Sequence, residues 1–177
     1  MNINYFQGRL DSPYHISIGA VVVNGEGKIC CHYFDKVTIP NLGTFENLNI
    51  LMRETLEQNE TIENCLARGL MEEFGMKAIL RSFVGSIVSH YPTIKDGQPT
   101  DVITEKTTLY FLCDFISIDE ASRNSGEDDP EAKSDIQWVS PLELIQRMKE
   151  QGERMNREDA DESVVVERAF DIINKTL

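Results

Sequence analysis

Two adjacent acids, Glu72 and Glu73, end a segment whose apolar residues recur at helical spacing. Wound at about 100° per residue, Ile62, Leu66 and Leu70 form one apolar arc, and Glu73 falls inside that arc. A carboxylate in a core-facing stripe costs free energy unless a partner compensates it. The helix dipole disfavours each acid in the last turn by roughly 0.3–1 kcal/mol, and the two acids also repel each other. A hard divalent cation would relieve all three penalties, so the pattern indicates a site rather than an ordinary helix end.

The simplest alternative is that Glu72 and Glu73 lie on a solvated helix face, because glutamate is rarely buried without a partner. The residues around them favour a site. Residues 60–76 read ETIENCLARGLMEEFGM, which resembles the box of the Nudix family, G-x5-E-x7-R-E-U-x-E-E-x-G-U, where U is aliphatic. Of the nine specified positions, seven match: Glu60, Arg68, Leu70, Glu72, Glu73, Gly75 and Met76. Agreement at this level arises by chance in roughly one chain in several thousand.

The resemblance implies an α/β (α+β) fold in which a mixed β-sheet is sandwiched between helices. It also implies hydrolysis of a nucleoside diphosphate linked to another group, with Mg²⁺ or Mn²⁺ as the cofactor. Carried onto this sequence, it implies that Glu72 and Glu73 are metal ligands and catalytic residues, and that Arg68 joins them by orienting a box glutamate. It further implies that Glu60 ties the preceding loop to the helix. Without the resemblance, Arg68 could simply form an ion pair with Glu72, four residues further along.

Two positions of the box depart from the family pattern. The opening glycine is Glu54 here, which we expect to reshape the loop before the helix, because glycine permits backbone angles that glutamate does not. The acid after the box arginine is Gly69, one turn before Glu72 and Glu73. In the family this acid usually helps to bind metal and is sometimes assigned as the base. The glycine also weakens the helix, by roughly 0.5–1 kcal/mol relative to alanine.

A carboxylate from elsewhere could replace the acid missing at Gly69, because a general base need only come within hydrogen-bond reach of the water. The acids we consider lie in the acidic segment 119–135 or near the start of a strand: Glu127, Asp128, Asp129, Glu131, Asp101 and Glu105. The alternative is that the acidic segment is a solvated, mobile loop. A lone histidine more often packs or lies at the surface than acts as a base, and this expectation covers His15, His32 and His90.

Three functions are compatible with these residues. The first is a metal-dependent Nudix-type pyrophosphohydrolase acting on a small nucleotide-type molecule, and we favour it because acids persist in a core-facing stripe mostly where they act. The second is a binding module on the same fold with weak or no catalysis, for which Gly69 is the main argument. The third is an isomerase, which would need an acid/base pair such as cysteine and glutamate. The sequence shows no clear sign of such a pair, and the loops that set the substrate are not decoded by one sequence.

The elements that would position this site alternate along the chain. Runs of β-branched and aromatic residues predict strands at residues 14–23, 28–34, 49–53, 79–88, 104–115 and 136–139. Helical periodicity and capping signals, with Ser140 as one cap, predict helices at residues 61–74, 140–149 and 161–177. Proline and glycine predict loops at residues 35–49 and 90–101. This order predicts a mixed sheet packed between helices.

Length and composition predict a single domain over residues 1–177 that ends in an amphipathic helix, whose apolar face could serve the core or a homodimer. The net charge of −13 disfavours nucleic acid as a partner, since nucleic-acid binders carry a basic face. Apolar runs fall short of the ~20 residues of a membrane helix, and the first residues lack a signal-peptide core, so we expect a cytoplasmic protein with no membrane contact. Cys30 and Cys31 are predicted to point to opposite faces of a strand.

Overall fold

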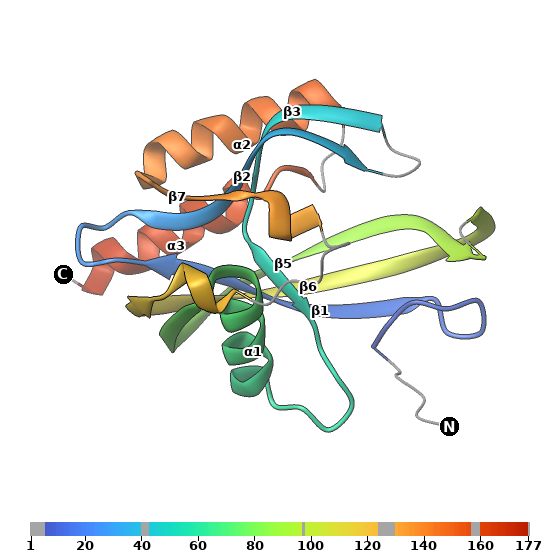
Figure 1. Ribbon diagram of the computed structural model, residues 1–177, viewed down its shortest axis with the longest axis horizontal. Helices are drawn as coiled ribbons and strands as arrows, with labels where there is room; N and C mark the ends of the chain where they lie inside the picture. Colours follow the sequence, from blue (N-terminus) through green and yellow to red (C-terminus); the bar gives the residue numbers. More distant parts are fainter. Residues whose placement is uncertain (1–5, 40–42, 97, 124–129, 157–159, 177) are drawn as a thin grey trace.

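The part of the chain that the structure describes forms one seven-stranded mixed sheet with helices on both faces (Figure 1). This computed structural model describes residues 6–39, 43–96, 98–123, 130–156 and 160–176. The strands are β1 (Tyr14–Val23), β2 (Ile29–Ile39), β3 (Gly43–Ile50), β4 (Met52–Thr55), β5 (Met76–Lys95), β6 (Gln98–Ile118) and β7 (Asp135–Val139). The helices are α1 (Ile62–Phe74), α2 (Pro141–Met155) and α3 (Ser163–Thr176), with 3-10 turns η1 (Glu120–Ser122) and η2 (Pro130–Lys133). The predicted fold class, a mixed sheet between helices, is confirmed.

The strand order is β3-β2-β1-β6-β5, with β4 paired to β1 and β7 paired to β2. The β1–β6 pair is parallel, and the other pairs are antiparallel. β1 and β2 join at Val23 and Ile29, on either side of a turn in which the N–H of Gly27 donates to the carbonyl oxygen of Asn24. Beyond that point β1 runs along β4 while β2 runs along β3, so the sheet opens into the two diverging halves visible in Figure 1.

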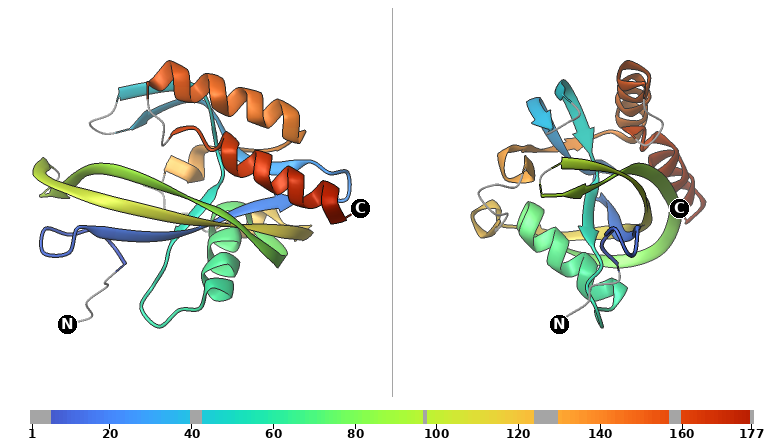
Figure 2. Two further views of the ribbon diagram at one scale, coloured as in Figure 1. Left: turned by 180° about the vertical axis from the view of Figure 1, so that it is seen from behind. Right: turned by 90° about the vertical axis from the view of Figure 1, so that its right-hand side faces the viewer.

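Two apolar cores lie on the two faces of the sheet. Alternate residues of β1 divide between them: Ile18 and Val22 pack toward α1, whereas Val21 and Val23 pack toward α2 and α3. Figure 2 shows α2 and α3 side by side, across the sheet from α1. The expected division of adjacent cysteines is also confirmed, because Cys30 belongs to the α1 core and Cys31 to the other. Both faces are therefore sealed by helices. Within the described residues, none of these helices is long and apolar enough to span a bilayer.

Helix α1 begins and ends where its sequence signals predict. The side chain of Thr61 accepts a hydrogen bond from the backbone N–H of Asn64 at 3.2 Å, which caps the first turn. Gly75 ends the helix in the left-handed conformation, with φ at 63°. A Cβ at Gly75 would lie 2.1 Å from the carbonyl oxygen of Asp119, so no other residue fits there. Glu72 and Glu73 thus come directly before a fixed stop.

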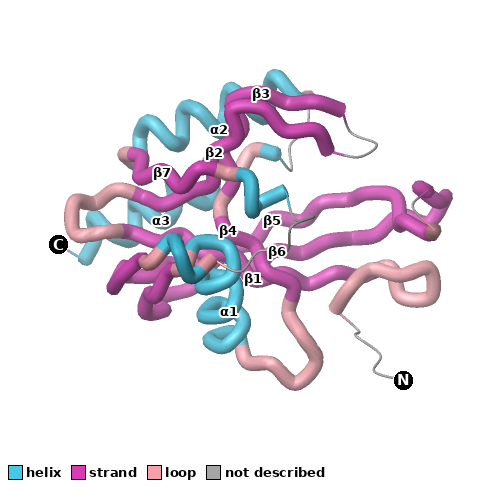
Figure 3. The backbone as a smooth tube through the Cα atoms, viewed as in Figure 1, coloured by secondary structure: helices cyan, strands magenta, loops and turns pink. Residues whose placement is uncertain are grey.

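Two predicted loops are wrong. Residues 35–49 lie mostly in β2 and β3, and residues 90–101 lie mostly in a long β5–β6 hairpin (Figure 3). Pro92 is tolerated because β5 is an edge strand, where one N–H is not needed by a neighbour. Pro99 lies at the start of β6, before β1 begins to pair with it at Glu105. In both strands the proline therefore avoids a position where its missing N–H would break the ladder.

The C-terminal half agrees more closely with the predictions. Strand β7 and helix α3 lie where they were expected, and Ser140 caps α2 by accepting from the N–H of Glu143. α2 continues to Met155, beyond the predicted end near residue 149. Of the acidic segment, η1 and η2 are described, whereas residues 124–129 lie outside the described residues.

Candidate functional site

The guanidinium of Arg68 joins α1 to the chain that precedes it. Its Nε and Nη2 atoms donate to the two carboxylate oxygens of Glu60, at 3.0 Å and 2.9 Å, and Nη2 also donates to the carbonyl oxygen of Thr55 at 2.9 Å. The hydrogen bonds from Arg68 lower the pKa of the Glu60 carboxyl below its usual value. This forked pairing fixes the end of β4 and the following loop against the helix.

The remaining nitrogen of the same guanidinium lies between two further carboxylates. Nη1 of Arg68 is 3.1 Å from Oε1 of Glu54 and 3.5 Å from Oε2 of Glu72. The i, i+4 pair with Glu72 therefore exists, but it is longer than the bonds to Glu60. Burial raises the pKa of Glu72, and the nearby Glu54 carboxylate adds to that rise. Glu54 and Glu72 consequently share one crowded, negatively charged corner.

Glu73 points away from that corner, into the core. It is 8% exposed, and its Oε2 lies 2.7 Å from Nε2 of His32 on β2. Burial lowers the pKa of His32 to about 3, and the charges of Arg123 and Arg53 add to this effect, so the ring is neutral at pH 7. An ionised Glu73 only accepts, so Nε2 donates to it, and Nδ1 lies 2.7 Å from the hydroxyl oxygen of Ser134. His32 thus holds the box acid in place.

The segment before β7 closes over this pair. Arg123 donates to the carbonyl oxygens of Ser134 at 3.1 Å and Glu131 at 2.7 Å. The hydroxyl of Ser134, which bonds His32, also donates to the carbonyl oxygen of Glu131 at 2.7 Å, so the backbone of Glu131 lies close to the pair of His32 and Glu73. Glu131 is therefore an acid from the predicted acidic segment that the fold brings toward the box helix. Its carboxylate could reach a substrate bound beside Glu73.

Among the described residues, the other acids that could replace the carboxylate missing at Gly69 lie away from the box helix. Glu105 is exposed on β6 and pairs with His90 at 3.7 Å. Asp101 is also exposed on β6, far along the β5–β6 hairpin. Asp128 and Asp129, like Glu127, lie outside the described residues. Of the acids considered, Glu131 is the one whose backbone is tied to the residues around Glu73, through Ser134 and His32.

Two cations near the box acids were missed by sequence reasoning. The Nε of Arg53, on β4, is 3.8 Å from a carboxylate oxygen of the buried Glu162, which also accepts from Tyr110 and from the N–H of Leu51. Burial lowers the pKa of Lys106 to about 8, with Arg53 adding to the shift. The signal available in the sequence was a basic residue within an otherwise apolar or β-branched strand.

His15 bonds side chains of two other strands. Its Nδ1 lies 2.8 Å from the hydroxyl of Tyr91, and its Nε2 lies 3.1 Å from the hydroxyl of Thr55. Burial lowers its pKa to about 4, and the charge of Lys106 adds to this. His15 is therefore a neutral linker between β1, β4 and β5.

The side chains suit a hard cation by their chemistry, since the acids of the box offer carboxylate oxygens. The described residues contain no group of three or more His, Cys, Asp or Glu side chains arranged to hold a metal ion. Instead, Glu72 faces Arg68, and Glu73 faces His32. A metal bound between Glu72 and Glu73 would therefore require these carboxylates to turn toward each other, away from Arg68 and His32.

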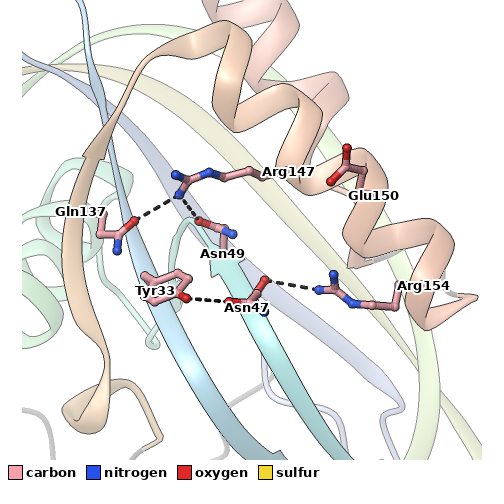
Figure 4. A pocket seen from close by; sticks show the side chains of 7 residues that line it. All are labelled: Tyr33, Asn47, Asn49, Gln137, Arg147, Glu150 and Arg154. Carbon is pink, nitrogen blue, oxygen red and sulfur yellow. Dashed lines mark hydrogen bonds between the residues drawn. The ribbon is translucent and has the colours of Figure 1, made fainter.

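A separate pocket lies on the other face of the sheet, between β2, β3, β7 and α2 (Figure 4). The cavity measures about 340 Å³ and is lined by Tyr33, Asn47, Asn49, Gln137, Arg147, Glu150 and Arg154. Several of these groups already bond one another: the Tyr33 hydroxyl donates to Asn47 at 2.7 Å, and Arg147 donates to Gln137 at 3.1 Å. Tyr33 and His32 are neighbours in β2 and point to opposite faces, so this pocket is distinct from the box acids.

Comparisons with known proteins agree with this architecture. The family described as "NUDIX domain" matches residues 13–158. No curated protein matches the chain. Among solved structures, a MutT protein from Methanosarcina mazei Go1 has 17% identity and a TM-score of 0.53, with 94% of this chain and 99% of that chain covered.

Two other solved structures are similar to the same extent. A Nudix hydrolase from Nitrosomonas europaea has 14% identity and a TM-score of 0.56, covering 91% of this chain and 88% of that one. A UDP-X diphosphatase has 13% identity and a TM-score of 0.54, covering 92% of this chain and 64% of that one. At these identities the structures support the fold alone. Because the domain match extends over residues 13–158, most of the chain, this protein belongs to the Nudix family.

Proposed function

We propose that the protein is a metal-dependent hydrolase that cleaves a diphosphate bond in a nucleoside diphosphate linked to another group. The observation that carries this proposal is the position of Glu73. Its carboxylate lies in the last turn of α1, almost buried, and its partner is the neutral ring of His32. A carboxylate placed against the helix dipole and out of water is costly, and such groups persist mostly where they act.

Glu72 and Glu73 would hold Mg²⁺ or Mn²⁺, because hard divalent cations prefer carboxylate oxygens. When bound, the cation supplies charge neutralisation at the diphosphate oxygens and lowers the pKa of the attacking water. The pair between Arg68 and Glu60 holds α1 against β4, so the two acids keep a fixed position relative to the sheet. Arg68 therefore acts on Glu72 through position and charge, 3.5 Å from its carboxylate.

The substrate class is supported by the cations near Glu73. A chain with a net charge of −13 repels a diphosphate unless positive groups gather locally. Arg53 and Lys106 provide such groups, and a diphosphate between them would also raise the lowered pKa of Lys106.

A second function, nucleotide binding without hydrolysis, is favoured by Gly69, which leaves the helix without one box acid. The isomerase alternative loses support from the thiols. All four cysteines are buried, and burial raises the pKa of Cys31, Cys65 and Cys113 to about 12, while the pKa of Cys30 is also raised by burial. A thiol in that state is a poor acid/base group at neutral pH.

Turnover of a panel of nucleoside diphosphate derivatives, with Mg²⁺ or Mn²⁺, tests the proposal. The variant Glu73→Gln keeps the shape of the side chain and an oxygen that can accept from His32, so the fold should persist. Glu63→Gln is a matched control, because Glu63 is an exposed acid in the first turn of the same helix.

A hydrolase would lose at least about a hundredfold in kcat on Glu73→Gln and keep its rate on Glu63→Gln. Absence of turnover on every substrate, together with measurable nucleotide binding by calorimetry, would instead identify a binding module. Equal rates for wild type and Glu73→Gln would remove Glu73 from the chemistry.

A further inference from the structure

We propose that Glu54 supplies the site carboxylate that the box would otherwise carry at Gly69. Compared with the box pattern, the glycine expected at position 54 of β4 and the acid expected at position 69 of α1 have changed places. The two departures from the box pattern then form one compensated change. This inference rests on one part of the proposed function, namely that the acids of the box bind a divalent cation. It assigns a further acidic residue to that site, on β4 rather than on α1.

Space is the first argument. Gly69 lies on the buried face of α1, opposite β4. A Cβ added at Gly69 would lie 2.6 Å from Cβ of Glu54, 2.9 Å from Sδ of Met52 and 3.1 Å from Cγ of Glu54. The Cβ of Glu54 is fixed by its backbone and cannot move aside as the end of a long side chain could. Only one of the two positions can therefore carry a side chain in this packing.

The location of the carboxylate is the second argument. Oε1 of Glu54 accepts from the N–H of Thr55 at 2.7 Å and lies 3.1 Å from Nη1 of Arg68. The same nitrogen is 3.5 Å from Oε2 of Glu72. The Glu54 side chain thus enters over Gly69 and ends beside Glu72, which lies one turn further along α1. That is the neighbourhood in which a side chain at position 69 would have placed its own carboxylate.

Charge is the third argument. Arg68 is already engaged by both oxygens of Glu60, which is a complete forked pair. Glu54 and Glu72 bring the number of carboxylates around this one guanidinium to three, so the four side chains together carry a net charge of −2 when ionised. A divalent cation has the charge that balances this group. The Glu54 side chain is 19% exposed and the Glu72 side chain 40% exposed, so a cation from solvent can reach the pair.

Binding of Mn²⁺ alone to the purified protein, measured by calorimetry and by electron paramagnetic resonance, tests the assignment without depending on turnover. The variants are Glu54→Gln, Glu54→Gly, and the exchange Glu54→Gly with Gly69→Glu. In Glu54→Gln the amide oxygen can still accept from Thr55 and Arg68, so this variant should fold. Glu63→Gln again serves as the control, and thermal unfolding without metal reports on purely structural effects.

Glu54→Gln and Glu54→Gly should each weaken Mn²⁺ binding by about tenfold or more, because charge count sets the affinity of such sites. The exchange variant should recover most of the wild-type affinity, since it moves the acid back to the helix and removes the Glu54 side chain, while the flexible Met52 side chain can move aside. Glu63→Gln should bind Mn²⁺ as the wild type does.

Three results would overturn the inference. One is an unchanged Mn²⁺ affinity in Glu54→Gln with a lowered unfolding temperature, which would make Glu54 only a structural partner of Arg68. Another is an exchange variant that folds but binds no better than Glu54→Gly. The third is a wild type that binds no Mn²⁺. The proposed function fails separately: Mn²⁺ binding that depends on Glu54, with no turnover of any substrate, would leave this assignment intact and remove the hydrolase.

Discussion

The carboxylate of Glu73 and the ring of His32 lie 2.7 Å apart in the core between α1 and β2, and the two residues are 41 positions apart in the sequence. The ring is fully buried, and its other nitrogen is held by Ser134. An acid of the Nudix box is therefore positioned by the half of the sheet that diverges from β1. This contact makes the stability of the fold and the geometry of the site depend on one another.

Replacing His32 with phenylalanine should lower the free energy of unfolding by about 1–3 kcal/mol, because Glu73 would remain buried without its donor. The double variant His32→Phe with Glu73→Leu should recover most of that loss, since removing both polar partners can be nearly neutral. Urea denaturation of the wild type, both single variants and the double variant measures the coupling. Additive effects within about 0.5 kcal/mol would show that the two side chains do not stabilise each other.

The same residue predicts a response to acid. The pKa of His32 is about 3 in the folded protein, below the usual 6.5, so the unfolded chain binds a proton first as the pH falls. The contribution of His32 to stability is complete above pH 6.5 and should decline progressively between about pH 6.5 and 3. Over that interval, the wild type should lose stability more steeply than His32→Phe, by up to about 1.4 kcal/mol per pH unit. Parallel pH profiles for the two proteins would contradict this expectation.

Gly69→Ala should be destabilising, although alanine normally strengthens a helix. The new Cβ would meet Cβ of Glu54 at 2.6 Å, and such overpacking typically costs about 1–3 kcal/mol. In a Glu54→Gly background the same substitution should become neutral or stabilising by about 0.5–1 kcal/mol, because only Sδ of Met52 remains within 3 Å and that flexible side chain can move aside. Thermal and urea unfolding of the four proteins gives the sign directly. A stabilising Gly69→Ala in the wild-type background would mean that α1 and β4 pack less closely than described.

Arg68→Lys should lower both stability and catalytic rate, since lysine cannot make the forked pair with Glu60 and also reach Thr55. We expect a loss of about 1–2 kcal/mol in the free energy of unfolding, and a lower kcat because Glu72 loses its neighbour. Arg81→Lys is the control: Arg81 makes a single contact of 3.4 Å with the exposed Asp114. That substitution should change stability by less than about 0.5 kcal/mol. Equal effects of the two variants would argue against a special role of the forked pair.

Lys106→Met should stabilise the protein at pH 7 while weakening substrate binding. The pKa of Lys106 is lowered to about 8 by burial and by Arg53, so below pH 8 the folded state carries the full cost of its charge. That cost falls as the pH rises from about 8 to 10.5, the usual value, and the gain from Lys106→Met should fade over the same interval. At pH 7 the gain should be on the order of 2 kcal/mol, with a higher KM for a diphosphate substrate. Unchanged KM would place Lys106 outside the binding site.

The sequence predicted an element correctly wherever the residues that define it are close together in the chain. The apolar stripe of residues 61–74, the cap at Thr61 and the stop at Gly75 predicted α1 nearly to its ends. The β-branched run in residues 14–23 predicted β1, and its alternation explains why both faces of the sheet are buried. The predicted loops failed because a proline ends a strand only where its missing N–H is needed, and strand order decides that.

The sequence by itself determined the family, the box helix and the acids Glu72 and Glu73, because these depend on residue types at fixed short spacings. Only the tertiary structure decided what those acids face. It brought His32 to Glu73, gathered Arg53 and Lys106 nearby, and set Glu54 against Gly69. The physical reason is that such contacts depend on strand register and on how β4 crosses α1, and no local pattern in one sequence encodes either. Glu54 and Gly69, the two positions that depart from the box pattern, are separate in the sequence but in contact in the folded protein.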